Sequence, residues 1–248
     1  MKILVCISHV PDTTSKINFT ENNTKFDTNG VQFVINPYDE YGLTRAMWFK
    51  EKQGAKVTVI NVGNTASEPT LRKALAIGAD DAIRVDTEAL DGMQVAKEIA
   101  EVVKNDGYDL VIAGRESIDY NGGMVPGMIA ATLDFNFVNG CNGIEVSEKN
   151  VKITREIDGG NETLETSLPL VIAGQKGIVE EKDLRIPNMR GIMMARKKPL
   201  NVVKPIGTTT TTNINSFEKP APKGACKMID ADNVQELIDL LHNEAKVI

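Results

Sequence analysis

The chain has 248 residues, enough for one α/β domain of ordinary size with appendages. Its 42% apolar and 5% aromatic residues are typical of a globular protein and exclude a disordered one. The formal net charge of −6, with a single short basic cluster at residues 196–198, argues against nucleic acid as the main partner.

Residues 3–10 form an apolar run that predicts a buried first strand. Polar Ser8 and His9 interrupt this run, which is too short for a signal peptide. No stretch approaches the roughly 18 apolar residues that a membrane span needs. We therefore expect a cytoplasmic protein without a transmembrane segment.

Amphipathic stretches then alternate with short apolar runs. Helices are predicted over 41–53, 68–77, 93–105 and 124–133, and strands over 56–62, 82–85 and 110–113. Near-continuous apolar strands separated by helices are typical of a parallel sheet covered on both faces. The predicted fold class is therefore α/β, with a doubly wound, mostly parallel sheet.

The pattern changes near residue 150. Alternating residues 150–157, the turn signal at 158–161 and residues 162–166 predict a β-hairpin appendage, followed by a strand over 168–173. The five threonines at 208–212 cannot build a core and predict an extended arm. The arm ends in a predicted amphipathic helix over 230–243, which must dock on its own domain or on a partner.

Three loops follow carboxyl ends of predicted strands, where open α/β sheets bind ligands. They are residues 8–12, 63–69 and 114–126. The third is rich in glycine and leads into a helix, so its amides are suited to holding a phosphate. No GxGxxG or GxxxxGK[ST] motif is present, and the same loops also suit tight turns and helix caps.

Histidine and cysteine are scarce. Two histidines, His9 and His242, leave almost no room for a metal site or a Ser-His-Asp triad, and three distant cysteines without a CxxC pair exclude a disulfide framework. We therefore predict neither catalytic nor metal-binding residues. His9 is as compatible with a structural role as with a functional one. Cys6, inside a predicted strand, is expected to be a small buried apolar residue.

Several segments are specific in combination. They are residues 1–5, 36–40, 71–80, the Arg-Glu-Ile-Asp-Gly-Gly run at 155–160, Leu168-Pro169 and the Ile-Met-Met-Ala-Arg-Lys-Lys run at 192–198. In this order they resemble the beta subunit of electron-transfer flavoproteins along nearly the whole chain. The resemblance implies a heterodimer with a larger alpha subunit that holds FAD, and a redox partner such as a dehydrogenase. It implies an electron-carrier subunit rather than an independent enzyme.

The resemblance also implies a cofactor site in this chain, for AMP in most members and for a second FAD in electron-bifurcating members. Carried over by position, its residues are Cys6, Asn36, Pro37, Tyr38, Asp39, Val62, Gly114, Arg115, Glu116, Ser117, Ile118, Asp119, Tyr120, Asn121, Gly122, Gly123, Met124 and Val125. Two segments depart from the family pattern. Pro126 has no N–H for a phosphate, and residues 181–185 lack the usual leucine anchor of the recognition loop.

These observations divide the chain into two parts. Residues 1–200 are the expected nucleotide-binding α/β domain, with the hairpin near 150–173 and the recognition loop near 178–190. Residues 201–248 are the expected C-terminal linker and docking helix. The alternative from another class is a lone nucleotide-binding signalling module of universal-stress-protein type, which would need neither the hairpin nor the arm.

Overall fold

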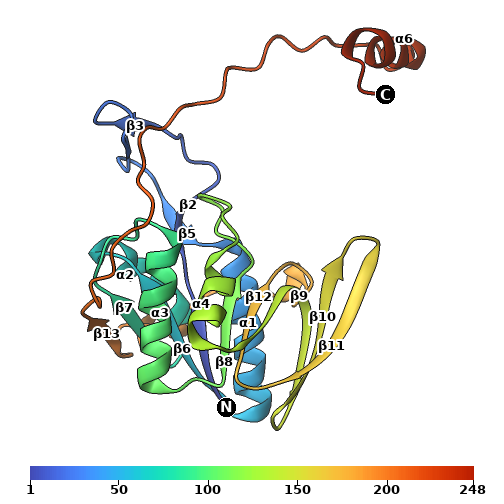
Figure 1. Cartoon of the computed structure of the whole chain (residues 1–248). Helices are drawn as coiled ribbons and strands as arrows, with labels where there is room; N and C mark the ends of the chain where they lie inside the picture. Colours follow the sequence, from blue (N-terminus) through green and yellow to red (C-terminus); the bar gives the residue numbers. More distant parts are fainter.

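The computed structural model describes all 248 residues as a nine-stranded sheet with helices on both faces (Figure 1). The strand order is β11-β10-β9-β12-β8-β1-β6-β7-β13. Every neighbouring pair from β9 across to β13 is parallel, whereas the β9–β10 and β10–β11 pairs are antiparallel. The predicted doubly wound, mostly parallel sheet is therefore confirmed.

The strands of this sheet are β1 Lys2–Cys6, β6 Lys56–Val62, β7 Asp81–Val85, β8 Leu110–Gly114, β9 Asn136–Ser147, β10 Asn150–Ile157, β11 Gly160–Ser167, β12 Leu170–Gly174 and β13 Leu200–Val203. The helices are α1 Pro37–Gln53, α2 Glu68–Ile77, α3 Gly92–Asp106, α4 Val125–Leu133, α5 Met189–Ala195 and α6 Val234–Asp239. Four short strands, β2 His9–Pro11, β3 Phe19–Thr20, β4 Lys25–Phe26 and β5 Phe33–Ile35, form two small hairpin-like pairs.

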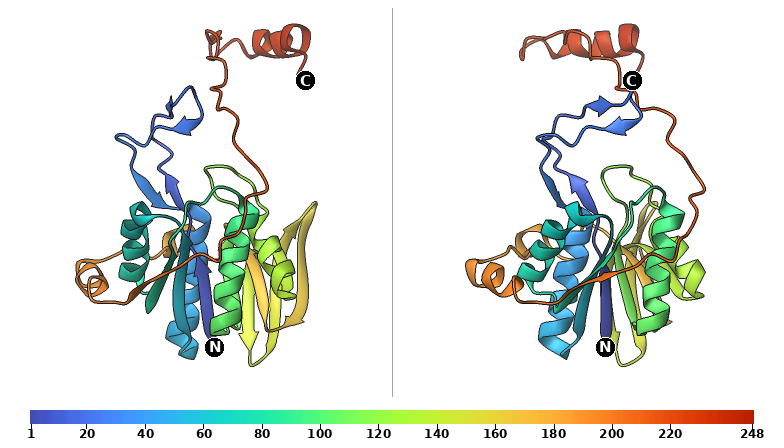
Figure 2. Two further views of the ribbon diagram at one scale, coloured as in Figure 1. Left: turned by 60° about the vertical axis from the view of Figure 1, so that its left-hand side comes forward. Right: turned by 90° about the vertical axis from the view of Figure 1, so that its left-hand side faces the viewer.

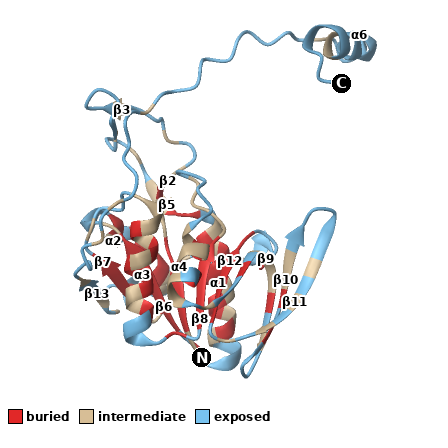
Figure 3. Cartoon of the chain, viewed as in Figure 1, coloured by how far each residue is buried: buried red, intermediate tan, exposed pale blue.

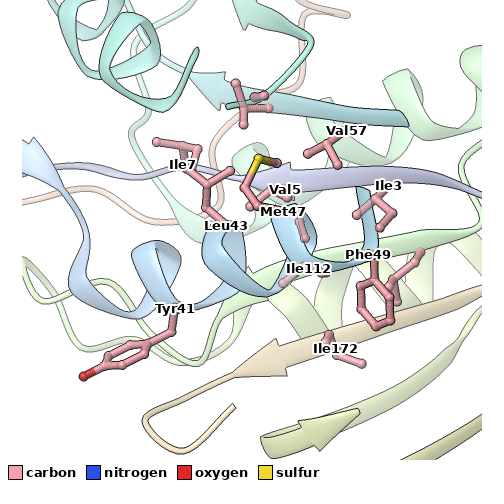
Figure 4. Close-up of a cluster of buried hydrophobic side chains, with 14 of the residues drawn as sticks. Ile3, Val5, Ile7, Tyr41, Leu43, Met47, Phe49, Val57, Ile112 and Ile172 are labelled. Carbon is pink, nitrogen blue, oxygen red and sulfur yellow. The ribbon is translucent and has the colours of Figure 1, made fainter. Parts of the chain in front are cut away.

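The core has two layers because alternate strand residues face opposite sides of the sheet. Ile3 and Val5 of β1 pack with Leu43 of α1 on one face (Figure 4). Leu4 of β1 packs with Ile99 of α3 on the other face. Burial of each such aliphatic side chain contributes roughly 1.5–3 kcal/mol, and the buried residues concentrate in the sheet and the helix faces that cover it (Figure 3).

Apart from the short strands β3, β4 and β5, three elements were not predicted: β9, β13 and α5. The hairpin β10–β11 is joined to β12 through β9, so it extends the central sheet rather than standing apart from it. Strand β9 carries several asparagines and glycines, residues depleted in strands. Strand β13 is a short edge strand with two exposed residues, so its apolar signal is weak.

Helix α5 packs on α2 and fixes the basic stretch that follows it. The Arg72 guanidinium donates hydrogen bonds to the carbonyls of Ala195 and Lys198, both at 2.8 Å. The Lys198 ammonium donates to the carbonyls of Leu75 (2.9 Å) and Ala79 (2.5 Å) at the end of α2. Lys198 is therefore a structural anchor, and burial lowers its pKa.

The C-terminal arm leaves β13, passes along α3 and rises to the β3–β4 hairpin (Figure 2). Beyond that point α6 stands apart from the sheet and its helices (Figure 1). Its apolar side chains Val234, Leu237 and Ile238 are 57%, 44% and 43% exposed. None of the helices combines the length and hydrophobicity that crossing a membrane requires.

The contact between α5 and α2 leaves no room for a side chain at Gly191, where a Cβ would overlap the Ala76 carbonyl oxygen. We predict that Gly191→Ala lowers the free energy of unfolding by about 1–3 kcal/mol, because α5 must shift away from α2. Urea denaturation measures this cost. Gly160→Ala is the control, since its Cβ would meet nothing within 4 Å. Equal stability of the two variants would contradict the tight α2–α5 packing.

Candidate functional site

A cavity of about 610 Å³ lies beyond the carboxyl ends of β1, β6 and β8. Its apolar walls come from the sheet and from α3 and α4, and include Cys6, Ile60, Val62, Ala113 and Met128. The first turns of α3 and α4 meet at its side, where a Cβ on Gly92 would lie 3.3 Å from atoms of Met124 and Val125. All three loops selected from the sequence contribute to this cavity.

Asp39, in the first turn of α1, joins the ends of two strands. Its carboxylate accepts hydrogen bonds from the backbone N–H of Ser8 (2.7 Å) and of Gly114 (2.9 Å), which follow or end β1 and β8. The side chain lines the cavity and is only 2% exposed. Burial raises the pKa of Asp39 to about 7, although the hydrogen bonds from Ser8, Asn36 and Gly114 oppose this shift.

Asn36 fixes the glycine-rich loop through two hydrogen bonds without lining the cavity. Its fully buried amide donates to the carbonyl of Glu116 (2.9 Å) and accepts from the N–H of Ile118 (3.2 Å). Asn36, Pro37, Tyr38, Ile118 and Asn121 are the expected site residues that do not line the cavity. The other thirteen expected residues do line it: Cys6, Asp39, Val62, Gly114, Arg115, Glu116, Ser117, Asp119, Tyr120, Gly122, Gly123, Met124 and Val125.

The loop from β8 to α4 is shaped by its own side chains. Asp119 accepts hydrogen bonds from the Ser117 hydroxyl (2.5 Å) and the Tyr120 N–H (2.9 Å). Gly123 has a φ of +61°, a left-handed conformation that favours glycine. The first N–H groups of a helix have no partner within the helix. The backbone N–H of Val125, the first residue of α4, is therefore available to a ligand, as are those of the loop just before it. Pro126 adds none.

Ionisable groups on the cavity wall are mostly acidic. The acidic side chains are Asp39, Glu88, Asp91, Glu116 and Asp119. Arg115 is the only lysine or arginine among the lining residues. Arg115 is engaged with Glu116 (3.0 Å) and Gln175 (3.2 Å). Carboxylates of this kind are suited to accept ribose hydroxyls, while the amides at α4 are suited to a phosphate. Apolar walls, free amides and hydroxyl acceptors together fit a nucleotide.

The potential proton-transfer groups of the cavity are tied to the protein. His9 stacks on Phe33 with ring centroids 4.2 Å apart, and its Nδ1 lies 2.8 Å from the Thr70 hydroxyl. Burial lowers the pKa of His9. The Cys6 thiol is buried, and burial raises its pKa. His9 therefore has contacts that account for it structurally.

Two parts of the wall were missed by the sequence reasoning. One is the loop after β7 together with the start of α3, where residues 88–93 and Val95 line the cavity. This segment carries no recognisable ligand-binding motif. The other is a piece of the C-terminal arm, comprising Thr211, Thr212 and Ile214. The arm lies more than a hundred positions from the loop that it contacts, and no periodic pattern predicts such a contact.

The raised pKa of Asp39 generates a pH prediction. An unfolded chain deprotonates aspartate near its ordinary pKa of about 4, whereas the folded chain keeps the proton until about pH 7. The stability from neutral Asp39 is thus complete below about pH 4 and is lost as the pH rises to about 7, by roughly 4 kcal/mol at most. Asp39→Asn, which cannot ionise, should therefore gain stability relative to the wild type over this range.

Urea denaturation of both proteins at several pH values measures this difference. A difference independent of pH between 4 and 8 would show that the two N–H donors keep the pKa of Asp39 near its ordinary value. A wild type that gains on the variant as the pH rises would reverse the sign of the shift.

Comparisons with known proteins identify the family of the chain. An electron transfer flavoprotein domain matches residues 23–206. The chain is 31% identical to electron transfer flavoprotein subunit beta of Bacillus subtilis, with 100% of both chains covered. It is 34% identical to the Syntrophomonas wolfei subunit beta, covering 100% of this chain and 98% of that one, and 29% identical to the human subunit beta, covering 100% and 99%. The chain therefore belongs to the electron transfer flavoprotein family, among its beta subunits.

Proposed function

We propose that this chain is the small subunit of a heterodimeric electron carrier, and that its cavity binds AMP. A larger alpha subunit holds the FAD, which supplies the redox chemistry when bound. The observation that carries the proposal is the cavity at the strand ends, walled by the glycine-rich loop and open to the free amides of α4. A lone signalling module is disfavoured by the full-length match to subunits of a larger assembly.

In this arrangement the amides from Gly122 to Val125 hold the phosphate, and the apolar walls at Cys6, Val62 and Ala113 enclose the rest of the ligand. Asp119 orients the loop rather than meeting the phosphate, because its carboxylate already accepts two hydrogen bonds and would repel an anion. Asp39 fixes the strand ends that form the floor.

The chain supplies shape and electrostatics, and it does not supply proton-transfer groups. Cys6 is a buried thiol with a raised pKa, and His9 is engaged by Phe33 and Thr70. We infer that it acts as a docking and positioning subunit rather than an enzyme. Ile178 and Val179 are buried, so the proposed surface for a redox partner such as a dehydrogenase comprises residues 180–190 and the exposed pair Arg196 and Lys197. A positive surface would attract an acidic partner.

Gly122 provides a sharp test of the cavity, since a Cβ there would meet no protein atom within 4 Å. We predict that Gly122→Val folds but loses at least about nine-tenths of its AMP, because the new side chain would fill space next to the phosphate-binding amides. Nucleotide extraction from the purified heterodimer measures the content. Gly160→Val, also open and exposed, is the control. Full AMP occupancy in Gly122→Val would place the ligand elsewhere.

Counting cofactors separates the two versions of the function. One FAD and one AMP per heterodimer means a simple carrier. Two FADs without AMP would mean that the cavity holds a second FAD, as in an electron-bifurcating flavoprotein that reacts with NADH, and would replace the AMP proposal.

The exposed apolar side of α6 is the proposed docking element for the alpha subunit, because it covers nothing in its own chain. We predict that Leu237→Asp weakens heterodimer association at least tenfold, since a carboxylate would be buried in an apolar contact. Sedimentation equilibrium measures the dissociation constant. Gln235→Asp on the same helix is the charge-matched control. Equal dissociation constants for the two variants would argue against docking through α6.

A further inference from the structure

The C-terminal arm forms one wall of the cavity, through Thr211, Thr212 and Ile214. We propose that the arm is a retaining strap for the nucleotide, and that Asp91 and Glu98 are the positioning residues that hold it in place. This inference rests on the proposed function, because it assigns a role in nucleotide retention. It concerns a segment that the sequence predicts only as an extended linker.

The first anchor is Asp91, at the start of α3. One carboxylate oxygen accepts from the Gln94 N–H (2.7 Å) and so caps the helix. The other oxygen faces the arm and accepts from the Thr211 N–H (2.5 Å), the Thr211 hydroxyl (3.0 Å) and the Thr212 N–H (3.1 Å). The hydrogen bond from the Gln94 N–H, together with those from Thr211 and Thr212, lowers the pKa of Asp91 to about 2. A single carboxylate thus joins the cavity rim to the arm.

The second anchor is Glu98, about two turns further along α3. Its side chain is only 2% exposed, although it carries a carboxylate on a helix flank. One oxygen accepts from the Ile206 N–H (3.0 Å), and the other accepts from the Thr208 hydroxyl (2.9 Å). A carboxylate this buried needs hydrogen-bonding partners, and its partners are both in the arm. Glu98 does not line the cavity.

The third anchor lies beyond the cavity, at the β3–β4 hairpin. Phe217 stacks on Phe19 with ring centroids 4.9 Å apart, and its N–H donates to the Asn23 carbonyl at 2.7 Å. The Lys219 ammonium donates to the Asn18 side chain at 2.8 Å. Between the Asp91 anchor and this hairpin the arm crosses in an extended conformation (Figure 2). Ile214, in this span, is one of the cavity-lining residues. A segment that lines the cavity and is fastened before and after the lining residues is placed to slow the exit of a ligand.

The threonines suit this role. Each supplies both a backbone N–H and a hydroxyl donor, so a short run can satisfy two carboxylates without an apolar core. Charged acceptors strengthen such hydrogen bonds. At its first two anchors the strap is therefore held by polar contacts, which can be removed one at a time while the sheet and its cores stay intact.

The test uses the heterodimer of this chain with its alpha subunit, loaded with radiolabelled AMP and chased with unlabelled AMP. Glu98→Gln and Thr208→Val loosen the arm without altering any cavity-lining residue. Asp91→Asn keeps the helix cap but turns a donor toward the Thr211 and Thr212 N–H groups. We expect each to release AMP roughly tenfold faster, the change that loss of about 1.4 kcal/mol of retention gives.

Glu101→Gln is the matched control, because Glu101 lies on the same helix and hydrogen-bonds only Asn105. It should release AMP at the wild-type rate. Hydrogen exchange of residues 206–212 reports independently whether the arm has loosened. Wild-type release from Glu98→Gln and Thr208→Val would overturn the strap, whether the arm has loosened or not, and would leave the nucleotide site standing. A wild-type heterodimer that holds no nucleotide would instead refute the proposed function, and the strap with it.

Discussion

The Asp39 carboxylate is the interaction on which the site depends. Strands β1 and β8 are neighbours in the sheet, and at their carboxyl ends the N–H groups of Ser8 and Gly114 turn toward the same side chain. A buried N–H without a partner would cost about 1–3 kcal/mol. Asp39 satisfies both from the first turn of α1. The two loops that leave these strands are thereby held in a fixed relation.

That clamp explains the composition around it. A Cβ on Gly114 would meet the Asp39 carboxylate and come within 2.7 Å of the Tyr38 Cβ, so the strand end must be glycine. Asn36, three residues before Asp39, then fixes the next turn of the same loop through Glu116 and Ile118. The segment from Asn36 to Asp39 is therefore the frame of the cavity more than its surface. Only Asp39 of these residues lines the cavity.

The ionisable side chains near the cavity are likewise used mainly for structure. Side chains that often transfer protons in enzymes are here engaged in structure: Asp39 by backbone amides, His9 by Phe33 and Thr70, and Cys6 by burial. What faces the cavity without such commitments is mostly backbone amide, glycine and apolar surface, together with the Glu88 carboxylate. A site of this kind recognises by shape and by fixed dipoles, which suits a subunit that holds a nucleotide and positions a partner.

The sequence was informative where local physics decides the structure. A β-branched apolar run located β6, and helical patterns located α2 and α3, all to within one residue. The rule for strand ends located the loop that begins at Gly114. It failed at α5, a helix of seven residues in which Gly191 lowers helix propensity but permits the close contact with α2. It also failed at the arm, because hydrogen bonds from Thr208 and Thr211 to α3 depend on tertiary placement and leave no periodic trace.

The arm is also where the two proposed binding events meet. Its first half is fastened to the cavity rim through Asp91 and Glu98, and its second half leads to α6, whose apolar side chains have no cover in this chain. A partner that fixes α6 restricts the motion of the intervening segment, and a ligand that packs against Ile214 restricts it from the other end. If both sites are occupied as proposed, the entropy of ordering this shared segment is lost once rather than twice. Linkage then requires that nucleotide and partner strengthen each other's binding by the same factor, however small the direct contact between them.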